Sequence, residues 1–206
     1  MSEKERLGNS SLKRIFTGIV LAFIVLVATL SDGWLFFSIF WLVILVSAFE
    51  WTAFIGLTDY FSKVTYSLAT LGLSLICSYA TKMPGFSIGY ILSGVILWFF
   101  LAIIIYRVSR GTGEFPSRNC LSFAFLGLII FSTTYVSIIY LYKLSPILII
   151  VLISTVCAVD VVAYFGGKSM GRRRFVPLIS PNKTWEGVWF GVVGGVTVAL
   201  VFKITF

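Results

Sequence analysis

The chain has 206 residues, of which 59% are hydrophobic and only 12% charged, and its formal net charge is +8. A soluble domain is about 45–50% apolar and about 25% charged, so this composition excludes an ordinary soluble fold and indicates a membrane protein. The bases lie in short segments between apolar runs, which argues against nucleic acid as a partner. The absence of histidine excludes His-based catalysis and His metal ligands. The cysteines have no metal-type spacing and are expected to pack as small apolar residues: Cys77, Cys120 and Cys157.

Seven apolar runs follow one another along the chain, and most approach the ~20 residues that cross ~30 Å of hydrocarbon as a helix. Segments of ~10 residues with alternating polarity, which a membrane barrel would need, do not appear. We therefore predict an all-α integral membrane protein, a bundle of about seven transmembrane helices in a single polytopic domain, residues 1–206. The predicted runs are 15–30, 34–57, 64–81, 86–106, 120–142, 146–167 and 187–206.

The distribution of positive charge predicts the orientation of these spans. With seven spans and a cytoplasmic N-terminus, thirteen of the 16 Lys and Arg residues fall in cytoplasmic segments, and only Lys82, Lys143 and Lys203 fall outside them. This asymmetry follows the positive-inside rule and predicts that a basic loop, 168–186, faces the cytoplasm. A secretory signal peptide at the N-terminus is the less favoured alternative, because no clear cleavage site follows the first run.

Two acids lie well inside apolar runs, Glu50 in the second and Asp160 in the sixth. An ionised carboxylate in lipid is costly, so such residues usually face a cavity, a partner or the bundle interior. Each acid precedes the cytoplasmic end of its run by seven residues, which is roughly 10 Å along a helix. A shared polar pocket at this depth is expected. The alternative is that each acid is protonated, or satisfied by a nearby hydroxyl or backbone group.

The segment after Asp160 combines glycines with a dense set of bases. Gly166, Gly167 and Gly171 would let the chain leave the membrane tightly and let another group approach the backbone. Five cations occur before the next acid, Glu186: Lys168, Arg172, Arg173, Arg174 and Lys183. At a cytoplasmic interface they favour an anion such as a lipid phosphate or a nucleotide triphosphate. Charge alone leaves open a simpler role, a positive-inside anchor that binds lipid headgroups loosely.

The stretch SPNKTWEG carries the most specific pattern in the chain. Ser180 followed by Pro181 fits a helix N-cap with proline in the first helical turn. The backbone N–H groups of such a helix start, with Lys183 and Thr184 beside them, favour a phosphate. Glu186 could hold a divalent ion or pair with an arginine. An ordinary capping turn is the alternative that needs no ligand.

Residues 160–187, D-x-x-A-Y-F-x-G-K-x-x-G followed by P-x-x-S-P-x-K-T-W-E-G, resemble the phosphatidate cytidylyltransferase (CDP-diacylglycerol synthase) family. That family has D-[ST]-G-A-Y-x-x-G-[RK]-x-x-G leading to S-P-x-K-T-x-E-G. The lead LKR-x-x-T-G at 12–18 and the pair Glu50-Trp51 are also similar to the family's N-terminal part. The similarity is loose over the whole chain and close over 157–187.

The resemblance implies a multi-pass enzyme of the plasma (inner) membrane that transfers CMP from CTP to phosphatidic acid. The products are CDP-diacylglycerol and pyrophosphate, a divalent metal such as Mg²⁺ is required, and members are thought to act as dimers. Asp160, Lys183 and Glu186 would be catalytic, with Asp160 and Glu186 as candidate metal ligands. Ser180, Asn182 and Thr184 would shape the turn. The residues expected to bind substrate are Lys168, Arg172, Arg173, Arg174, Ser180, Pro181, Asn182 and Thr184.

The sequence also departs from the family pattern. Val161-Val162 stands where the family has [ST]-G, and a chain without histidine cannot contain the family's later P-G-H-G-G signature. The expectation is an N-terminal part of a synthase, with a phosphate-binding half-site and few metal-binding acids. Two other classes stay open: a non-catalytic homologue that binds anionic lipid or pairs with a partner chain, and a small transporter using Glu50 and Asp160. The transporter is disfavoured because paired broken helices of inverted repeats are not seen.

Overall fold

The computed structural model describes residues 20, 23–31, 33–82, 85–112 and 120–205. The chain divides into two compact units, Met1–Val43 and Ile44–Phe206, and each is described by itself. In the first unit, residues 23–30 are helical and a turn at Gly33, with a positive φ of 78°, precedes α2 (Trp34–Ile55). Within the predicted first run, 15–30, residues 20 and 23–30 are helical, and the other residues of the run lie outside the described residues.

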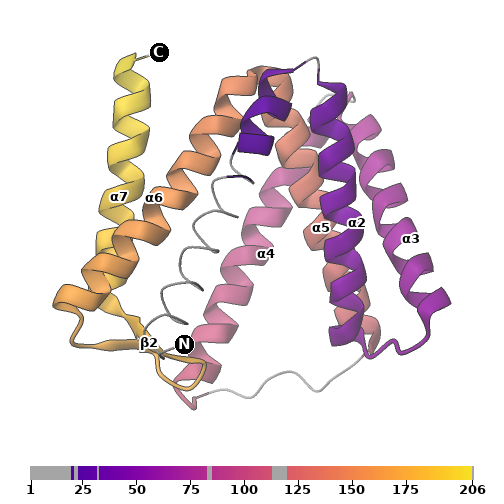
Figure 1. Ribbon diagram of the computed structural model, residues 1–206. Coiled ribbons are helices and arrows are strands. Elements are labelled where there is room, and N and C mark those ends of the chain that lie inside the picture. The colour runs from indigo at the N-terminus through magenta and orange to yellow at the C-terminus, as the bar shows by residue number, and fades with distance from the viewer. Residues whose placement is uncertain (1–19, 21–22, 32, 83–84, 113–119, 206) are drawn as a thin grey trace, which may run out of the picture. The chain divides into compact units, whose positions relative to one another are not determined.

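The second unit contains the end of α2, five further helices among the described residues, and one two-stranded hairpin (Figure 1). The helix starts follow local signals in the sequence. The Asp59 carboxylate accepts the N–H of Ser62 at 2.9 Å and caps α3, which begins at Tyr60, and Pro146 is the first residue of α6. The bounds are α3 (Tyr60–Ala80), α4 (Phe86–Ser109), α5 (Cys120–Leu144), α6 (Pro146–Met170) and α7 (Trp185–Thr205).

Five of these helices, α2, α4, α5, α6 and α7, are long and apolar enough to cross a membrane. The prediction of a mainly helical membrane protein is confirmed at this level. α3, which covers the third predicted run, is not among the five, and the hairpin is an addition to the all-α prediction. The predicted count of seven spans and the cytoplasmic N-terminus stay predictions.

α3 packs against α5 through a face of small hydroxyl residues rather than through large apolar side chains. Ser67, Thr70 and Ser74 are buried, and their hydroxyls donate to the carbonyls of Lys63, Tyr66 and Thr70 at 2.7–2.8 Å. Because each hydroxyl is satisfied within its own helix, the polar face can be buried without orphaned groups. Small side chains also let two helix backbones approach closely.

Two side chains anchor α2 and α3 to neighbouring carbonyls of α5. The indole N–H of Trp51 donates to the Phe123 carbonyl, and the Tyr66 hydroxyl donates to the Ala124 carbonyl, both at 2.9 Å. A Cβ on Gly127 would collide with both donors. Helical Cβ atoms tilt toward the N-terminus, over the carbonyls of the preceding turn. Glycine at this position therefore leaves the two carbonyls open to a second hydrogen bond each.

α6 and α7 lie side by side along a ridge of glycines (Figure 1). Gly187, Gly191 and Gly195 recur every four residues on α7. A Cβ on Gly191 would stand 3.2 Å from the Ala163 Cβ, and one on Gly195 would stand 3.0 Å from a Val159 methyl. Such small-residue spacing lets membrane helices approach through backbone contact. The hairpin connects these two closely packed helices.

The prediction that Gly166 and Gly167 end the membrane run is wrong, because α6 continues through both to Met170. Their other predicted role, a close approach of a neighbouring group, is confirmed. A Cβ on Gly166 would overlap the Phe190 ring, and one on Gly167 would stand 3.0 Å from the Thr184 hydroxyl. Glycine at these two positions removes the side chain that would block the neighbour, and the helical hydrogen bonds of α6 are kept.

Candidate functional site

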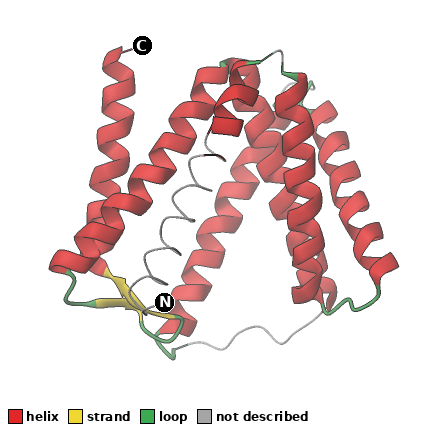
Figure 2. Cartoon of the chain, viewed as in Figure 1, coloured by secondary structure: helices red, strands yellow, loops and turns green. Residues whose placement is uncertain are grey.

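The segment between α6 and α7 folds as an antiparallel hairpin of β1 (Arg174–Val176) and β2 (Ser180–Thr184), drawn in yellow in Figure 2. The Cα partners are Arg174 with Thr184 and Val176 with Ser180. The predicted basic loop is therefore an ordered hairpin from residue 174 onward. The prediction that Ser180 caps a helix, with Pro181 in its first turn, is wrong, because both residues belong to β2.

Thr184 is the residue that turns the hairpin into α7. Its hydroxyl accepts the N–H of Gly187 at 3.2 Å, three residues ahead, which is the geometry of a helix N-cap. The N–H of Trp185 donates to the Arg173 carbonyl at 2.9 Å, which ties the helix start to the residue before β1. Thr184 also packs on Gly167 and Gly171 of the preceding segment. The helix start therefore lies four residues later than the sequence pattern indicated.

Glu186, in the first turn of α7, holds the chain that enters the hairpin. Its carboxylate accepts the backbone N–H of Arg172 at 3.0 Å and that of Arg173 at 3.2 and 3.3 Å. Its sequence context predicts either a divalent ion or an arginine side chain as its partner. The contacts seen are to the main chain of Arg172 and Arg173, so these hydrogen bonds do not occupy the guanidinium groups.

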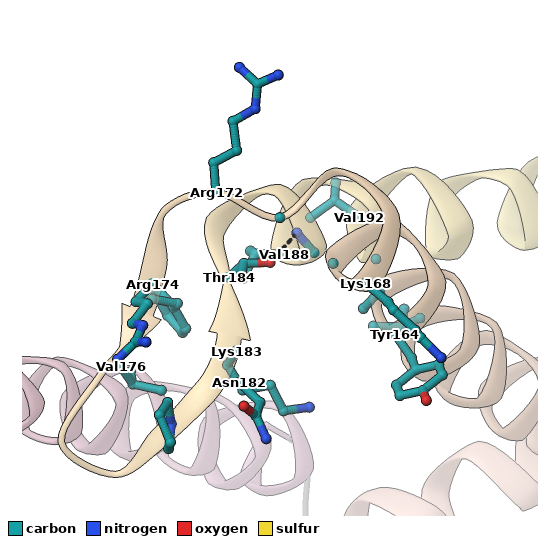
Figure 3. Close-up of a pocket in the computed structure, with 18 residues that line it drawn as sticks. Tyr164, Lys168, Arg172, Arg174, Val176, Asn182, Lys183, Thr184, Val188 and Val192 are labelled. Atoms are coloured by element: carbon teal, nitrogen blue, oxygen red, sulfur yellow. Dashed lines mark hydrogen bonds between the residues drawn. The ribbon is translucent and has the colours of Figure 1, made fainter.

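A cavity of about 920 Å³ lies where α6, the hairpin and α7 meet (Figure 3). α6 contributes Val159, Ala163, Tyr164, Gly167 and Lys168. The hairpin and its lead contribute Gly171, Arg172, Arg174, Phe175, Val176, Pro181, Asn182, Lys183 and Thr184. α7 contributes Gly187, Val188, Gly191 and Val192.

The cavity lining separates into a cationic part and an apolar part. The cations are Lys168 on α6, Lys183 on β2, and Arg172 and Arg174, and the lining contains no Asp or Glu. In Figure 3 the Arg172 side chain extends away from the other labelled side chains. The rest of the lining is largely valine, alanine and glycine from the two helices. Such a cavity suits a molecule with an anionic head and an apolar tail.

Residues 12–206 match the family model described as the cytidylyltransferase family. The chain belongs to the cytidylyltransferase family. No solved structure matches it.

Named relatives of this cytidylyltransferase chain are phosphatidate cytidylyltransferases. The protein of Pseudomonas aeruginosa is 29% identical over 184 residues, covering 87% of this chain and 66% of the relative. That of Haemophilus influenzae is 27% identical over 206 residues, covering 89% of this chain and 71% of the relative. That of Bacillus subtilis is 50% identical over 42 residues, 20% of this chain. The chain thus spans about two thirds of the length of the first two relatives.

The cytidylyltransferase cavity brings together many, not all, of the residues predicted from sequence. Those that line it are Lys168, Arg172, Arg174, Pro181, Asn182, Lys183 and Thr184. Arg173 and Glu186 instead line a second cavity. Ser180 is half-buried in β2 opposite Val176, and Asp160 is exposed on α6 outside the lining of either cavity. Glu50 is exposed on α2.

Sequence reasoning missed two groups that shape this site. Tyr164 stands one turn before Lys168, whose ammonium lies 5.9 Å from the centre of its ring, and both line the cavity. The glycine ridge of α7, which supplies Gly187 and Gly191, was detectable as a four-residue repeat of small residues. Arg110, which lines the second cavity, was not predicted either, because only the fold brings the end of α4 to the hairpin.

The described residues do not provide a metal centre on their own. Among them, no group of three Cys, Asp or Glu side chains is placed to hold an ion. Glu186 is engaged by two backbone N–H groups, and Asp160 does not line the cavity. A magnesium site usually needs carboxylate oxygens with open positions for water or phosphate. The two candidate ligands, Asp160 and Glu186, do not fit that description.

Proposed function

We propose that this protein is a phosphatidate cytidylyltransferase, which makes CDP-diacylglycerol and pyrophosphate from CTP and phosphatidic acid in phospholipid biosynthesis. The observation that carries the proposal is the cavity with four cations and an apolar floor between two membrane-type helices. Phosphatidic acid has the matching chemistry, a phosphate head on apolar chains. The family to which the chain belongs supports the same reaction class.

The reaction joins two anions. An oxygen of the lipid phosphate attacks the α-phosphorus of CTP, a new P–O bond forms, and the bond to the β-phosphate oxygen breaks as pyrophosphate leaves. Cations around the reacting phosphates reduce the repulsion, and fixed positions lower the entropic barrier. Lys168 and Lys183 approach the cavity from different elements, so together they can hold one phosphate between α6 and β2.

The position of Lys183 is set by its neighbours in the hairpin. β2 pairs with β1, and Thr184, the next residue, packs on Gly167 and caps α7. We propose Lys183 as a phosphate-binding catalytic residue and Glu186 as a positioning residue that fixes the main chain of Arg172 and Arg173. We also propose Asp160, one turn before Tyr164 on α6, as a polar contact for substrate.

We further propose that the site faces the cytoplasm, where CTP is available. The positive-inside distribution supports this orientation, because Lys168, Arg172, Arg173, Arg174 and Lys183 gather at one end of α6 and α7. The protein would then be a multi-pass protein of the plasma (inner) membrane with a cytoplasmic N-terminus. A homodimer is a further expectation, to be measured by light scattering of the detergent-purified protein.

A turnover assay tests the proposed reaction. The full chain is purified in detergent with phosphatidic acid, radiolabelled CTP and Mg²⁺, and label moving into lipid is followed. We expect labelled CDP-diacylglycerol, strongly reduced in Lys183→Ala and retained in Lys203→Ala, at the other end of α7. If a well-folded protein binds phosphatidic acid but forms neither labelled lipid nor pyrophosphate, the non-catalytic alternative replaces this proposal.

A further inference from the structure

A second cavity, of about 830 Å³, lies against the same hairpin. Its lining includes four arginines and two tryptophans: Arg110, Arg172, Arg173, Arg174, Trp185 and Trp189. Arg172 and Arg174 line both cavities, whereas Lys168 and Lys183 line only the first. The two cavities therefore share Arg172 and Arg174 at the boundary between them.

Arg110 reaches this cavity from a distant part of the chain, the C-cap of α4. Its guanidinium lies 5.5 Å from the centre of the Tyr106 ring, a cation–π contact. The Tyr106 ring lies 5.9 Å from Phe175 and 6.2 Å from Trp185, and the last two rings are 4.7 Å apart. This aromatic cluster fastens the end of α4 to β1 and to the start of α7. Arg110 is thereby held beside the arginines of the hairpin.

One acid, Glu186, also lines the second cavity. Its carboxylate oxygens already accept backbone N–H groups of Arg172 and Arg173, at 3.0 to 3.3 Å. One carboxylate engaged with the main chain cannot neutralise four guanidinium groups. The cavity therefore keeps a strong excess of positive charge.

The chemistry of the two linings differs in a way that separates ligands. The first cavity has a floor of valine, alanine and glycine, which suits acyl chains, and two lysines. The second has Pro177, two indole rings and four arginines in the lining, with no valine, leucine or isoleucine. Guanidinium groups bind phosphate oxygens in bidentate pairs, whereas a lysine acts as a point charge. Indole rings offer flat faces on which a base can stack.

From this contrast we infer that the second cavity binds the polyphosphate of a nucleoside triphosphate, while the first holds the phosphate of the lipid. The inference rests on the proposed function and deepens it, since it names the cavity that each substrate takes. Arg172 and Arg174, which line both cavities, would contact phosphates of both substrates where the two cavities adjoin. The Glu186 carboxylate holds the main chain of Arg172 and Arg173 in place, and β1 pairing with β2 holds that of Arg174.

Binding without turnover tests the assignment. The full chain in detergent is titrated separately with pyrophosphate, with CTP and with phosphatidic acid in mixed micelles, using calorimetry. Arg110→Gln should weaken pyrophosphate and CTP about tenfold, the loss of about one charge-assisted hydrogen bond, and leave phosphatidic acid unchanged. Lys168→Gln should do the reverse. Arg107→Gln is the matched control, because Arg107 lies on α4 and lines neither cavity.

The outcomes separate this inference from the proposed function. Equal pyrophosphate binding by Arg110→Gln and Arg107→Gln overturns the inference, and so does a loss of phosphatidic acid binding in Arg110→Gln. If Arg110→Gln fails to fold, Arg110→Lys is used instead, because it keeps the charge but not the bidentate guanidinium group. Arg110→Lys must then bind pyrophosphate more weakly than Arg107→Lys does. Arg110-dependent pyrophosphate binding without lipid labelling supports the site and rejects the enzyme. Lipid labelling with Arg110-independent pyrophosphate binding rejects the site and supports the enzyme.

Discussion

The carboxylate of Glu186 accepts the backbone N–H of Arg173 at 3.3 Å through Oε1 and 3.2 Å through Oε2. The N–H of Arg172 donates to the same group at 3.0 Å. An acid in the first turn of α7 also complements the positive end of the helix dipole. Glu186 therefore fixes the main chain that carries the arginines, so its effect on ligands should be indirect.

Glu186→Ala should weaken pyrophosphate binding by about tenfold, because Arg172 and Arg173 lose the acceptor that positions them. Glu186→Gln keeps one acceptor oxygen, so its pyrophosphate affinity should lie between that of Glu186→Ala and that of the parent protein. Calorimetric titration of pyrophosphate measures the effect, and thermal unfolding in detergent shows whether the fold is retained. A folded Glu186→Ala protein with parental pyrophosphate affinity would show that the contact does not position the arginines.

Gly166→Ala tests the close contact between α6 and α7. A Cβ on Gly166 would overlap the Phe190 ring, and the neighbouring helix must shift to admit it. Overpacking of this kind typically lowers the free energy of unfolding by about 1–3 kcal/mol. Gly89→Ala on α4 is the control, since a Cβ there meets nothing within 4 Å. Thermal unfolding, monitored by tryptophan fluorescence, should give a lower midpoint for Gly166→Ala than for Gly89→Ala. Equal midpoints would contradict the packing argument.

Part of this arrangement could be predicted from the sequence alone. The run 120–142 closely matches α5, Cys120–Leu144, because continuous apolarity bounded by polar residues marks a membrane-type helix. The end of α6 was placed too early, because a Gly-Gly pair reads as a break when no packing partner is known. Its partner Phe190 lies on another helix. Helix ends that depend on tertiary contacts cannot be read from local propensity.

The cations of the site were predicted, but their division between two cavities was not. Arg172, Arg173 and Arg174 are adjacent in sequence, yet Arg173 lines only the second cavity. The hairpin places the arginines in different cavities. It was not predicted because Ser180-Pro181, which belongs to β2, resembles a helix start in sequence. Arg110 could not be assigned, because its link to the hairpin runs through aromatic contacts among Tyr106, Phe175 and Trp185 rather than through spacing along the chain.

Gly127→Ala should break the two hydrogen bonds that hold α2 and α3 to α5. The added Cβ would occupy the space of the Trp51 indole and the Tyr66 hydroxyl, which donate to consecutive carbonyls of α5. Loss of these hydrogen bonds is expected to lower the unfolding free energy by about 1–3 kcal/mol. Gly72→Ala on α3, where a Cβ meets nothing within 4 Å, is the matched control. The anchor interpretation fails if both variants unfold at the same denaturant concentration.

Lys168 and Lys183 line the first cavity from α6 and β2, and their joint action on one phosphate can be measured. Each single change to Gln should lower kcat/KM for phosphatidic acid by about tenfold, since a charge-assisted contact to phosphate is lost. If both side chains hold the same phosphate, the double variant should lose less than the product of the single effects, because contacting residues are not additive. Initial rates of lipid labelling give kcat/KM for the parent, the two single variants and the double variant. Lys143→Gln, outside the cavity, is the control. Strict additivity would place the two lysines on different ligands and contradict a shared phosphate.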